Sequence, residues 1–356
     1  MALSLPQPPR SIAVVKLSAI GDVCHALPVI RTLQRHWPQA RFTWLIGRTE
    51  AALIGRVPEI EFIVYDKGAG LGGLAAVRRA LGGRRFDLLL HMQFALRASL
   101  AAAVVRSPVK LGYDRERALD LQWLFTTHRI EPAPREHVMD GLFGFARALG
   151  VSARDYRWDI PVPPEALEYA ARAIPEASPT LIVSPCSRHA LRNWSAAHYA
   201  RVADHAAREF GLKILLCGGG SEGERRMGAE IVHHMREPCT DLIGRDTLIR
   251  FHATLARSWA LLTPDSGPAH MATAVGIPVL GLYAATRSAR SGPYFSREWC
   301  VDRFDAAARK FCGRSADELP WRAKIERPGV MALIEPEAVI ERLGALAAHR
   351  AVERSA

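Results

Sequence analysis

Short runs that are apolar throughout alternate with amphipathic segments along nearly the whole chain. Examples of the apolar runs are 11–17 (SIAVVKL), 41–47 (RFTWLIG) and 86–92 (FDLLLHM), and the segment 26–38 has the spacing of a helix. A strand buried on both faces is a continuous apolar run, and such strands occur in parallel sheets that helices cover on both sides. The sequence therefore predicts an α/β fold with parallel sheets.

One interruption divides this alternation into two halves. The segment 159–179 carries five of the chain's 23 prolines, and the pattern restarts directly after it. A chain of 356 residues has the length of two domains of roughly 150 residues each. We predict two Rossmann-like domains, 1–165 and 178–335, followed by a helix over 336–356 that we expect to pack across the domain junction.

Each half contains several further predicted elements. In the first half we expect strands over 61–66 and 109–114 and a loop at 68–73 (GAGLGG). In the second half the expected strands are 180–186, 212–220, 240–244, 259–265 and 278–284, with helices beginning at His198, Glu222, Thr247 and Pro268.

The charge balance points to a negatively charged partner. The chain has 47 Lys and Arg against 36 Asp and Glu, which gives a net charge of +11. The tract 78–117 alone holds nine basic and three acidic residues. Nucleic acid would explain the charge, but this tract has no recognisable DNA- or RNA-binding motif. The alternatives for it are a solvated surface and a site for an anionic acceptor.

Three features bear on location and metal content. No stretch reaches the roughly 18 apolar residues of a membrane-spanning helix, and the N-terminus lacks the regions of a signal peptide. The six cysteines lie far apart without a CxxC pair, as is typical of reduced thiols. We expect a cytoplasmic protein without a structural metal.

The first candidate site follows the first predicted strand, in KLSAIGDVCHALP. Gly21 permits a sharp turn, and Asp22 lies at the carboxyl end of the strand where a helix begins. Ligands of open α/β sheets bind at this edge. Aspartate is also a common helix N-cap, so both interpretations stay open.

A second candidate site is the segment PDSGPAHMATAVG. A strand ends at Asp265, Ser266 and Gly267 form a turn, and Pro268 occupies a favoured first position of a helix. The free amides and the dipole of such a helix can bind a phosphate, and His270 can add a donor one turn further on. The alternative is an ordinary helix start with a packed histidine.

Two further loops follow strands of the second half. Ser187, Arg188 and Arg192 offer a hydroxyl and two cations that suit phosphate oxygens, although an exposed basic loop has the same composition. The glycines 218–220 allow close approach of a ligand, and Glu222 can accept hydrogen bonds from a ribose diol. Three glycines alone match no specific phosphate motif.

Together these segments resemble the bacterial lipopolysaccharide heptosyltransferases. The resemblance rests on 16–30 (KLSAIGDVCHALPVI), 187–194, 218–224 (GGGSEGE) and above all 265–283 (DSGPAHMATAVGIPVLGLY). The last segment matches the family's D-[ST]-G-x-x-H-x-A-x-x-x-G-x-P pattern at every defined position. The resemblance implies the GT-B fold, in which two Rossmann-like domains face each other across a cleft.

The resemblance also implies an activity, the inverting, metal-independent transfer of L-glycero-D-manno-heptose from ADP-heptose to a sugar hydroxyl of the lipid A inner core, without a cofactor. Asp22 matches the family's general base. Asp265 would hold heptose hydroxyls and Glu222 the ribose. The residues that would bind the ADP phosphates are Ser187, Arg188, Arg192, Ser266, Gly267 and His270. The chain departs from the family in having Arg192 where Lys is usual and Ser266 where Thr is usual, and the segment 284–294 lacks the common glycine-proline-threonine.

On the acceptor side, the resemblance favours the first heptosyltransferase, which acts on Kdo. Gly21, Gln93, Arg97 and His137 fall where it places the acceptor loops, and the basic tract suits the phosphates and carboxylates of Kdo-lipid A or phosphorylated Kdo-lipid A. A lipid acceptor implies contact with the cytoplasmic face of the inner membrane through basic surface, without an anchor.

Other interpretations stay open to different degrees. A second-step heptosyltransferase, or a related enzyme with another nucleotide sugar, has the same fold. A Rossmann-type dehydrogenase needs a glycine fingerprint that KLSAIGD lacks. A non-catalytic nucleic-acid binder would explain the charge but does not need Asp22 and Asp265 at two strand ends. We therefore predict no nucleic-acid partner.

Overall fold

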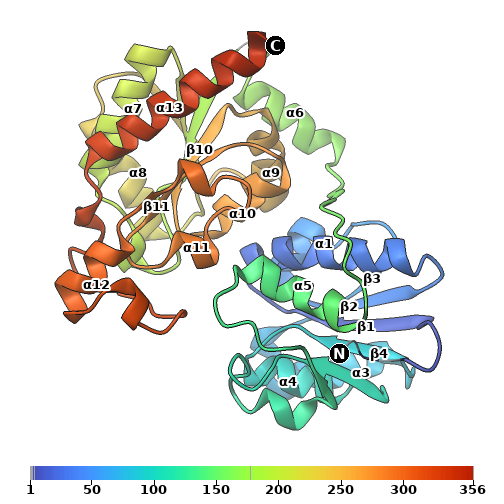
Figure 1. Ribbon diagram of the computed structural model, residues 1–356. Helices are drawn as coiled ribbons and strands as arrows, with labels where there is room; N and C mark the ends of the chain where they lie inside the picture. The colour runs from blue at the N-terminus through green and yellow to red at the C-terminus, as the bar shows by residue number, and fades with distance from the viewer. Residues whose placement is uncertain (1–2, 4, 177, 356) are drawn as a thin grey trace. The chain divides into compact units, whose positions relative to one another are not determined.

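The computed structural model describes residues 3, 5–176 and 178–355 (Figure 1). Its contacts divide the chain into two compact units, Met1–Pro161 and Val162–Ala356, and the division falls inside the proline-rich segment. Among the described residues, no helix has the length and apolar character needed to cross a membrane.

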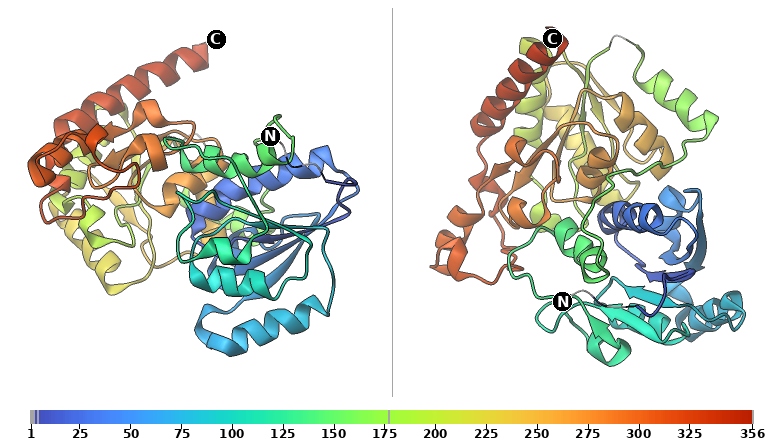
Figure 2. Two further views of the ribbon diagram at one scale, coloured as in Figure 1. Left: turned by 60° about the horizontal axis from the view of Figure 1, so that its bottom comes forward. Right: turned by 45° about the vertical axis from the view of Figure 1, so that its right-hand side comes forward.

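Unit 1 is built on a six-stranded sheet in which all neighbouring strands are parallel, in the order β3-β2-β1-β4-β5-β6. The strands are β1 Ser11–Val15, β2 Arg41–Gly47, β3 Ile60–Tyr65, β4 Leu88–His91, β5 Val109–Gly112 and β6 His128–Arg129. The helices are α1 Ile20–His36, α2 Arg48–Ile54, α3 Gly70–Leu81, α4 Leu96–Ala103 and α5 Val138–Ala148, with short 3-10 helices at Lys67–Ala69 and Gln122–Phe125. Figures 1 and 2 show α1 and α5 on one face of the sheet and α3 and α4 on the other.

Unit 2 repeats this plan with a second parallel sheet, in the order β12-β11-β10-β7-β8-β9. Its strands are β7 Thr180–Val183, β8 Lys213–Leu216, β9 Cys239–Asp241, β10 Ala260–Pro264, β11 Val279–Tyr283 and β12 Val301–Asp302. Its helices are α6 Pro164–Ala173, α7 Ala196–Phe210, α8 Glu222–His234, α9 Leu248–Arg257, α10 Gly267–Ala274, α11 Ser288–Ser291, α12 Phe304–Cys312 and α13 Pro336–Ser355. Short 3-10 helices lie at Ala190–Arg192, Arg297–Trp299, Ala316–Glu318 and Met331–Leu333.

The order of the strands fixes where each unit can bind a ligand. In unit 1 the chain moves outward from β1 in one direction to β2 and in the other to β4, and in unit 2 the same reversal occurs between β7 and β10. The connections that leave such neighbouring strands diverge and open a crevice at their carboxyl ends. Asp22 follows β1, and Asp265 follows β10.

The prediction of an α/β fold with two parallel sheets is confirmed, because the strands of each core are buried on both faces. Ile12 to Val15 of β1, for example, have no exposed surface. The predicted loop at 68–73 is wrong, since Gly70–Leu81 forms α3. Gly73 allows this helix to lie close to the preceding chain, where a Cβ atom would meet the Asp66 carbonyl oxygen at 2.6 Å.

The C-terminal helix α13 completes the core of unit 2. Val339, Leu343 and Leu346 on its inner side have no exposed surface and join the same apolar cluster as α7 and β11. Its principal contacts are with α7, β11 and β12, all in its own unit. Packing of this helix across the junction, and the predicted domain bounds, stay predictions.

Candidate active-site residues in the two units

Asp22 lies in the first turn of α1, at the carboxyl end of the central strand of unit 1. Its Oδ2 atom accepts a hydrogen bond from the Ala19 N–H at 3.1 Å and lies 3.2 Å from the Lys16 Nζ atom. The Lys16 side chain is only 5% exposed, whereas that of Asp22 is 39% exposed. A buried ammonium requires a counter-charge, and Asp22 supplies it while solvent reaches the carboxylate. Asp22 is therefore both a helix cap and an accessible carboxylate.

Gln93 holds the loop that precedes Asp22. Its Oε1 atom accepts hydrogen bonds from the N–H groups of Leu17 at 2.6 Å and Ser18 at 3.2 Å. Behind it, the fully buried Gln122 donates to the carbonyl oxygens of His91 and Gln93, both at 2.9 Å. Two amide side chains in series thus fix the backbone that carries the carboxylate. An acceptor contact of Gln93 stays a prediction.

The other residues predicted for the acceptor side lie on different elements of unit 1. Gly21 is buried in the first turn of α1, and Arg97 is exposed on α4. His137 is buried at the N-cap of α5, where its Nδ1 atom accepts a hydrogen bond from the Met139 N–H. The His137 ring packs against the His25 ring of α1 at 5.4 Å. Their contact with an acceptor stays a prediction.

His91 ends β4 and has no exposed surface. Burial lowers its pKa to about 3, and the nearby charges of Lys110 and Lys16 act in the same direction. Its Nε2 atom lies 3.0 Å from the Ser99 hydroxyl. His91 is therefore neutral at physiological pH and acts as a packed polar residue beneath the candidate site.

Arg192 joins two carboxylates of unit 2 that are far apart in sequence. Its Nη1 atom donates to Asp265 Oδ2 and its Nε atom to Glu326 Oε1, both at 2.9 Å. The Thr286 hydroxyl donates to the same Asp265 oxygen at 2.8 Å. Burial acts to raise the pKa of Glu326, but the hydrogen bond and charge of Arg192 outweigh it and lower that pKa. Sequence reasoning found Arg192 and Asp265 but missed Glu326, which belongs to no motif.

The loops after β7 and β10 are tied together next to this group. The Ser187 hydroxyl donates to the Asp265 carbonyl oxygen at 2.9 Å. The Ser266 hydroxyl pairs with Thr263 at 2.8 Å, so the N-cap side chain makes no hydrogen bond to the first turn of α10. His270 is buried one turn into that helix, whereas Arg188 is exposed. The structure thus brings Ser187, Arg192, Asp265 and the start of α10 together in unit 2.

The glycine loop after β8 is closed by Glu224. This residue and Ser221 form a capping box at the start of α8, and Glu224 also accepts the Gly219 N–H at 2.8 Å. Glu222 lies exposed at the first position of the helix. Gly220 packs against Gly244, where a Cβ atom would approach the Gly220 Cα atom at 2.9 Å. The glycines therefore serve close loop packing, and the ribose contact of Glu222 stays a prediction.

A half-buried carboxylate that the sequence did not indicate, Asp246, lies just before α9. The Oδ2 atom of Asp246 is buried and has no hydrogen-bond partner among the described residues, and the same holds for the Tyr169 hydroxyl. Burial raises the pKa of Asp246 to about 6. The Arg250 guanidinium stacks 5.0 Å from the centre of the Tyr169 ring. This carboxylate is therefore costly to ionise in the folded protein.

Replacing Asp246 by Asn is expected to stabilise the protein at pH 8 and to change little at pH 4. The folded protein holds the Asp246 proton up to about pH 6, whereas the unfolded chain releases it near its ordinary value of 3.8. Stability is therefore lost as the pH rises through this window, and Asn removes the loss. The gain at pH 8 is on the order of 1–2 kcal/mol, because the residue is only partly buried.

Urea unfolding at the two pH values measures this effect. Glu168→Gln on α6 is the matched control, because it makes the same kind of change at an exposed carboxylate next to Tyr169. Equal stabilities of the Asp246→Asn variant and the parent at both pH values would contradict the assignment.

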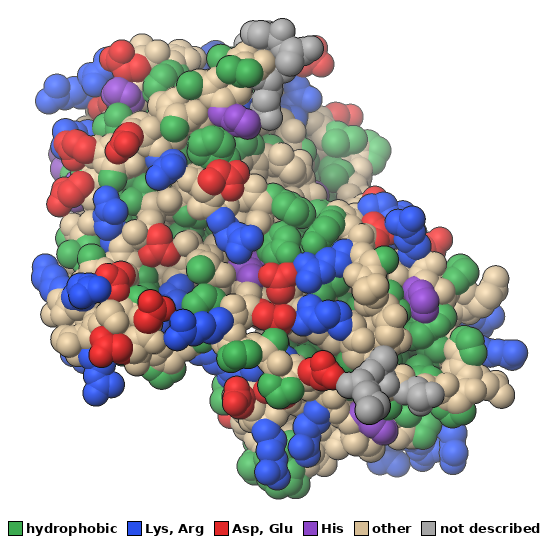
Figure 3. All heavy atoms as spheres, in the orientation of Figure 1, with side chains coloured by type: hydrophobic (Ala, Val, Ile, Leu, Met, Phe, Trp, Pro, Cys, Tyr) green, Lys and Arg blue, Asp and Glu red, His purple; other side chains and the backbone are tan. Residues whose placement is uncertain are grey.

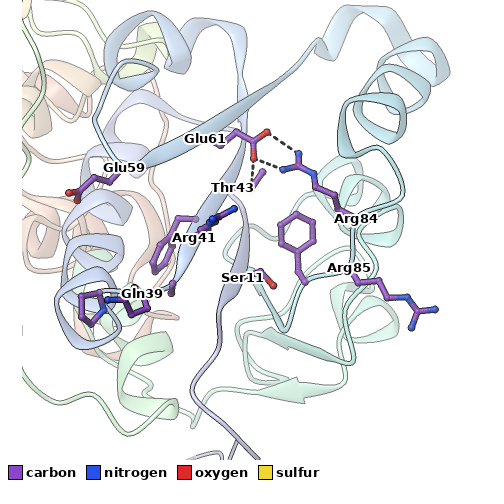
Figure 4. A pocket seen from close by; sticks show the side chains of 12 residues that line it. Ser11, Gln39, Arg41, Thr43, Glu59, Glu61, Arg84 and Arg85 are labelled. Atoms are coloured by element: carbon purple, nitrogen blue, oxygen red, sulfur yellow. Dashed lines mark hydrogen bonds and ion pairs between the residues drawn. The ribbon is translucent and has the colours of Figure 1, made fainter.

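A cavity of about 720 Å³ lies at the opposite edge of the unit 1 sheet. It is lined by residues at the amino ends of the strands, among them Ser11, Arg41 and Glu61 (Figure 4). In Figure 4 Arg84 points toward Glu61, with contacts of 2.6 and 2.9 Å that lower the pKa of Glu61. Because ligands of parallel α/β sheets bind at the carboxyl edge, this cavity is not the candidate active site.

Comparison with known proteins identifies the family. The family model described as "Glycosyltransferase family 9 (heptosyltransferase)" matches residues 74–318. The chain belongs to this family. The lipopolysaccharide core heptosyltransferase OpsX of Haemophilus influenzae is 34% identical over 335 residues, which cover 94% of this chain and 96% of that protein. The lipopolysaccharide heptosyltransferase 1 of Escherichia coli K12 is 22% identical over 297 residues, 80% of this chain and 90% of that protein.

Solved structures of family 9 proteins have the same fold as this heptosyltransferase. A family 9 glycosyl transferase from Veillonella parvula superimposes with a TM-score of 0.79 at 22% identity, covering 98% of this chain and 99% of that one. The Escherichia coli heptosyltransferase WaaC, solved with ADP, gives a TM-score of 0.70 at 19% identity, with 94% and 99% covered. The GT-B fold and the resemblance to heptosyltransferases are confirmed. The protein is a glycosyltransferase of family 9, the heptosyltransferase family.

Proposed function

We propose that the protein transfers L-glycero-D-manno-heptose from ADP-heptose to Kdo of the lipid A inner core, with inversion and without a metal. The observation that carries this proposal is the pair of preformed polar groups at the carboxyl ends of β1 and β10. Unit 1 supplies an accessible carboxylate at Asp22, and unit 2 supplies a guanidinium at Arg192 beside the uncapped start of α10. A base and an anion site are the two elements that displacement of a nucleoside diphosphate requires.

In the proposed step, the acceptor hydroxyl oxygen attacks the anomeric carbon of heptose and its proton passes to the Asp22 carboxylate. The bond between the anomeric carbon and the distal phosphate oxygen breaks, and the electron pair leaves with ADP. One displacement inverts the anomeric centre. Asp22 is suited to this role because its side chain is 39% exposed and is held at the carboxyl end of β1 by the Ala19 N–H and the Lys16 ammonium.

Arg192 takes up the charge that develops on the leaving diphosphate. Three of its five N–H groups are directed at Asp265 and Glu326 in the structure, and we propose that the other two bind phosphate oxygens. The first-turn amides of α10 add dipoles of the right sign. In our proposal Ser187 and His270 complete this phosphate site, while Asp265 and Glu222 bind heptose and ribose hydroxyls.

The acceptor assignment is tested by ADP release in EDTA, with ADP-heptose and with Kdo-lipid A present or omitted, and by the mass of the product. We expect release that depends on Kdo-lipid A and yields one added heptose. Product formed only on an already heptosylated core would establish the second-step alternative instead. Failure to bind ADP-heptose, measured by calorimetry, would overturn the donor assignment.

A metal requirement is tested in the same experiment. Among the described residues, no three His, Cys, Asp or Glu side chains lie close enough together to hold a metal ion. This leaves metal independence a prediction, because a metal can also be carried by the diphosphate. We expect equal rates in EDTA and in added Mg²⁺, and a rate that collapses in EDTA would contradict the proposal.

We also propose that the enzyme works at the cytoplasmic face of the inner membrane, since its acceptor is a lipid. The net charge of +11 favours binding to an anionic surface. No nucleic-acid partner is proposed.

A further inference from the structure

Unit 1 exposes an unusual group of large apolar side chains on and next to α4. Each of them is between 37% and 59% exposed. The group, called here the leucine–tryptophan face, consists of Leu96, Leu100, Leu119, Leu121, Trp123 and Leu124. Single exposed leucines are common on protein surfaces, but a group of this size on α4 and on the segment that packs against it marks a contact surface.

Hydrogen bonds and packing hold the face together as one surface. Leu96 and Leu100 are one turn apart on α4, and α4 packs against the 3-10 helix Gln122–Phe125. The Leu96 N–H donates to Asp120 Oδ2 at 3.2 Å, which ties the loop to the start of α4. The buried Gln122 anchors the 3-10 helix from beneath. The exposed side chains therefore project from a fixed backbone.

The stability of the fold does not explain why residue 121 is a leucine. Leu121 has φ 57°, in the left-handed region that leucine rarely adopts, and its side chain is 57% exposed. A branched apolar residue at such a position gains little from burial in the folded chain, and Asn would fit the backbone better. Backbone strain that is not offset by packing of the side chain is typical of functional surfaces.

Arginines accompany the apolar side chains. Arg97 is exposed on α4 directly after Leu96, and the Arg115 guanidinium lies 5.8 Å from the centre of the Trp123 ring. Neither arginine has an ion-pair partner within 4 Å in the described part of the chain. In Figure 3, blue and green side chains lie next to each other at the lower end of unit 1, where Figure 1 places α4. The acidic neighbours are the exposed Glu116 and Asp120, whose carboxylate is bonded to α4.

We propose that the leucine–tryptophan face docks unit 1 on a bilayer that carries anionic headgroups. Interfacial membrane contacts typically combine leucines that enter the acyl boundary, a tryptophan at headgroup level and arginines that bind lipid phosphates. A bilayer fits better than a folded protein partner, because the face offers arginines directly beside the apolar residues, and such a pairing suits acyl chains with anionic headgroups above them.

The face also lies next to the predicted acceptor side. Gln122, between Leu121 and Trp123, donates to the Gln93 carbonyl oxygen, and Gln93 holds the loop before Asp22. Docking through this face would therefore bring the Asp22 loop to the membrane that contains the lipid acceptor. In this respect the inference rests on the proposed function.

Vesicle flotation of the full-length protein tests the docking surface. The probes are vesicles of phosphatidylcholine alone and vesicles with added phosphatidylglycerol, at low and high salt. We expect the parent protein to bind the anionic vesicles. The double variant L121N/L124N should bind them about tenfold or more weakly. The variant R97Q/R115Q should show a smaller loss of affinity on anionic vesicles and no loss on neutral vesicles. Asn suits the left-handed backbone at 121, so the first variant should fold.

The matched control is L167N/V232N, which replaces a leucine and a valine of similar exposure in unit 2. This control should bind vesicles like the parent. Binding by L121N/L124N equal to that of the parent would overturn the proposal. A third outcome would assign the face to contact between two copies instead. In that case the parent would not bind vesicles and would sediment as a dimer, and L121N/L124N would sediment as a monomer.

An activity measurement separates this proposal from the proposed function. With a deacylated, water-soluble Kdo acceptor, L121N/L124N should keep the parent's turnover, whereas with acceptor in anionic vesicles its rate should fall about tenfold. A parent protein that binds vesicles but transfers heptose to neither acceptor would refute the proposed function and leave the docking surface standing. Equal loss of rate by the variant with both acceptors would overturn the docking role.

Discussion

The Asp22→Asn variant is expected to lose turnover by about a hundredfold or more while it keeps its affinity for ADP. Asn has the same shape but cannot take the proton of the acceptor hydroxyl, and general-base catalysis contributes about 10²–10⁴ in rate. Binding of ADP should be unchanged because the residues of the anion site all lie in unit 2. Single-turnover rates with bound ADP-heptose and ADP calorimetry measure the two quantities.

A control is needed because Asp22 is also the counter-ion of the buried Lys16 ammonium. Urea unfolding of Asp22→Asn reports the cost of leaving that ammonium unpaired. The double variant Lys16→Met/Asp22→Asn removes the unpaired charge, so it should regain stability without regaining turnover. Near-normal turnover of Asp22→Asn would remove Asp22 from the mechanism.

The Arg192→Ala variant is expected to bind ADP about a hundredfold more weakly than the parent. The substitution removes the cation proposed to meet the diphosphate and also leaves Asp265 and Glu326 without the guanidinium that neutralises both. Repulsion between these carboxylates and the phosphates then adds to the lost hydrogen bonds. Calorimetry with ADP measures the loss.

Two further variants separate these effects. Arg208→Ala is the matched control, because Arg208 is an exposed arginine on α7 of the same unit, outside the loops of the proposed phosphate site, and its loss should change ADP affinity only slightly. Arg192→Ala/Glu326→Gln should recover part of the affinity lost by Arg192→Ala, since one of the two carboxylates becomes neutral. Unchanged ADP affinity of Arg192→Ala would refute the phosphate assignment.

The architecture could be predicted because its strands are buried on both faces and therefore stand out as apolar runs. Strands β6 and β12 were missed because each has two residues, which is too short for any pattern. The segment 68–73 was misassigned because glycine usually breaks helices. In α3 tertiary contact outweighs this preference, since Gly73 allows the helix to approach the chain at Asp66.

The candidate site could be predicted only where its residues follow strands within recognisable motifs. Asp22, Arg192 and Asp265 were found in this way, because the carboxyl ends of parallel strands meet at one edge. Glu326 and Gln122 were missed, since they reach the site from a loop and a short 3-10 helix through contacts that no local spacing encodes. Their positions depend on how the chain folds back on itself.

The carboxylates around Arg192 have a kinetic consequence for turnover. Asp265 and Glu326 orient the guanidinium within the protein itself, so in the proposed function donor binding requires no search among side-chain rotamers. In the same proposal the two carboxylates hold and neutralise the cation when ADP leaves, so the product is not drawn back by an uncompensated positive charge. We therefore expect the arrangement to favour rapid replacement of ADP by ADP-heptose over tight binding of either.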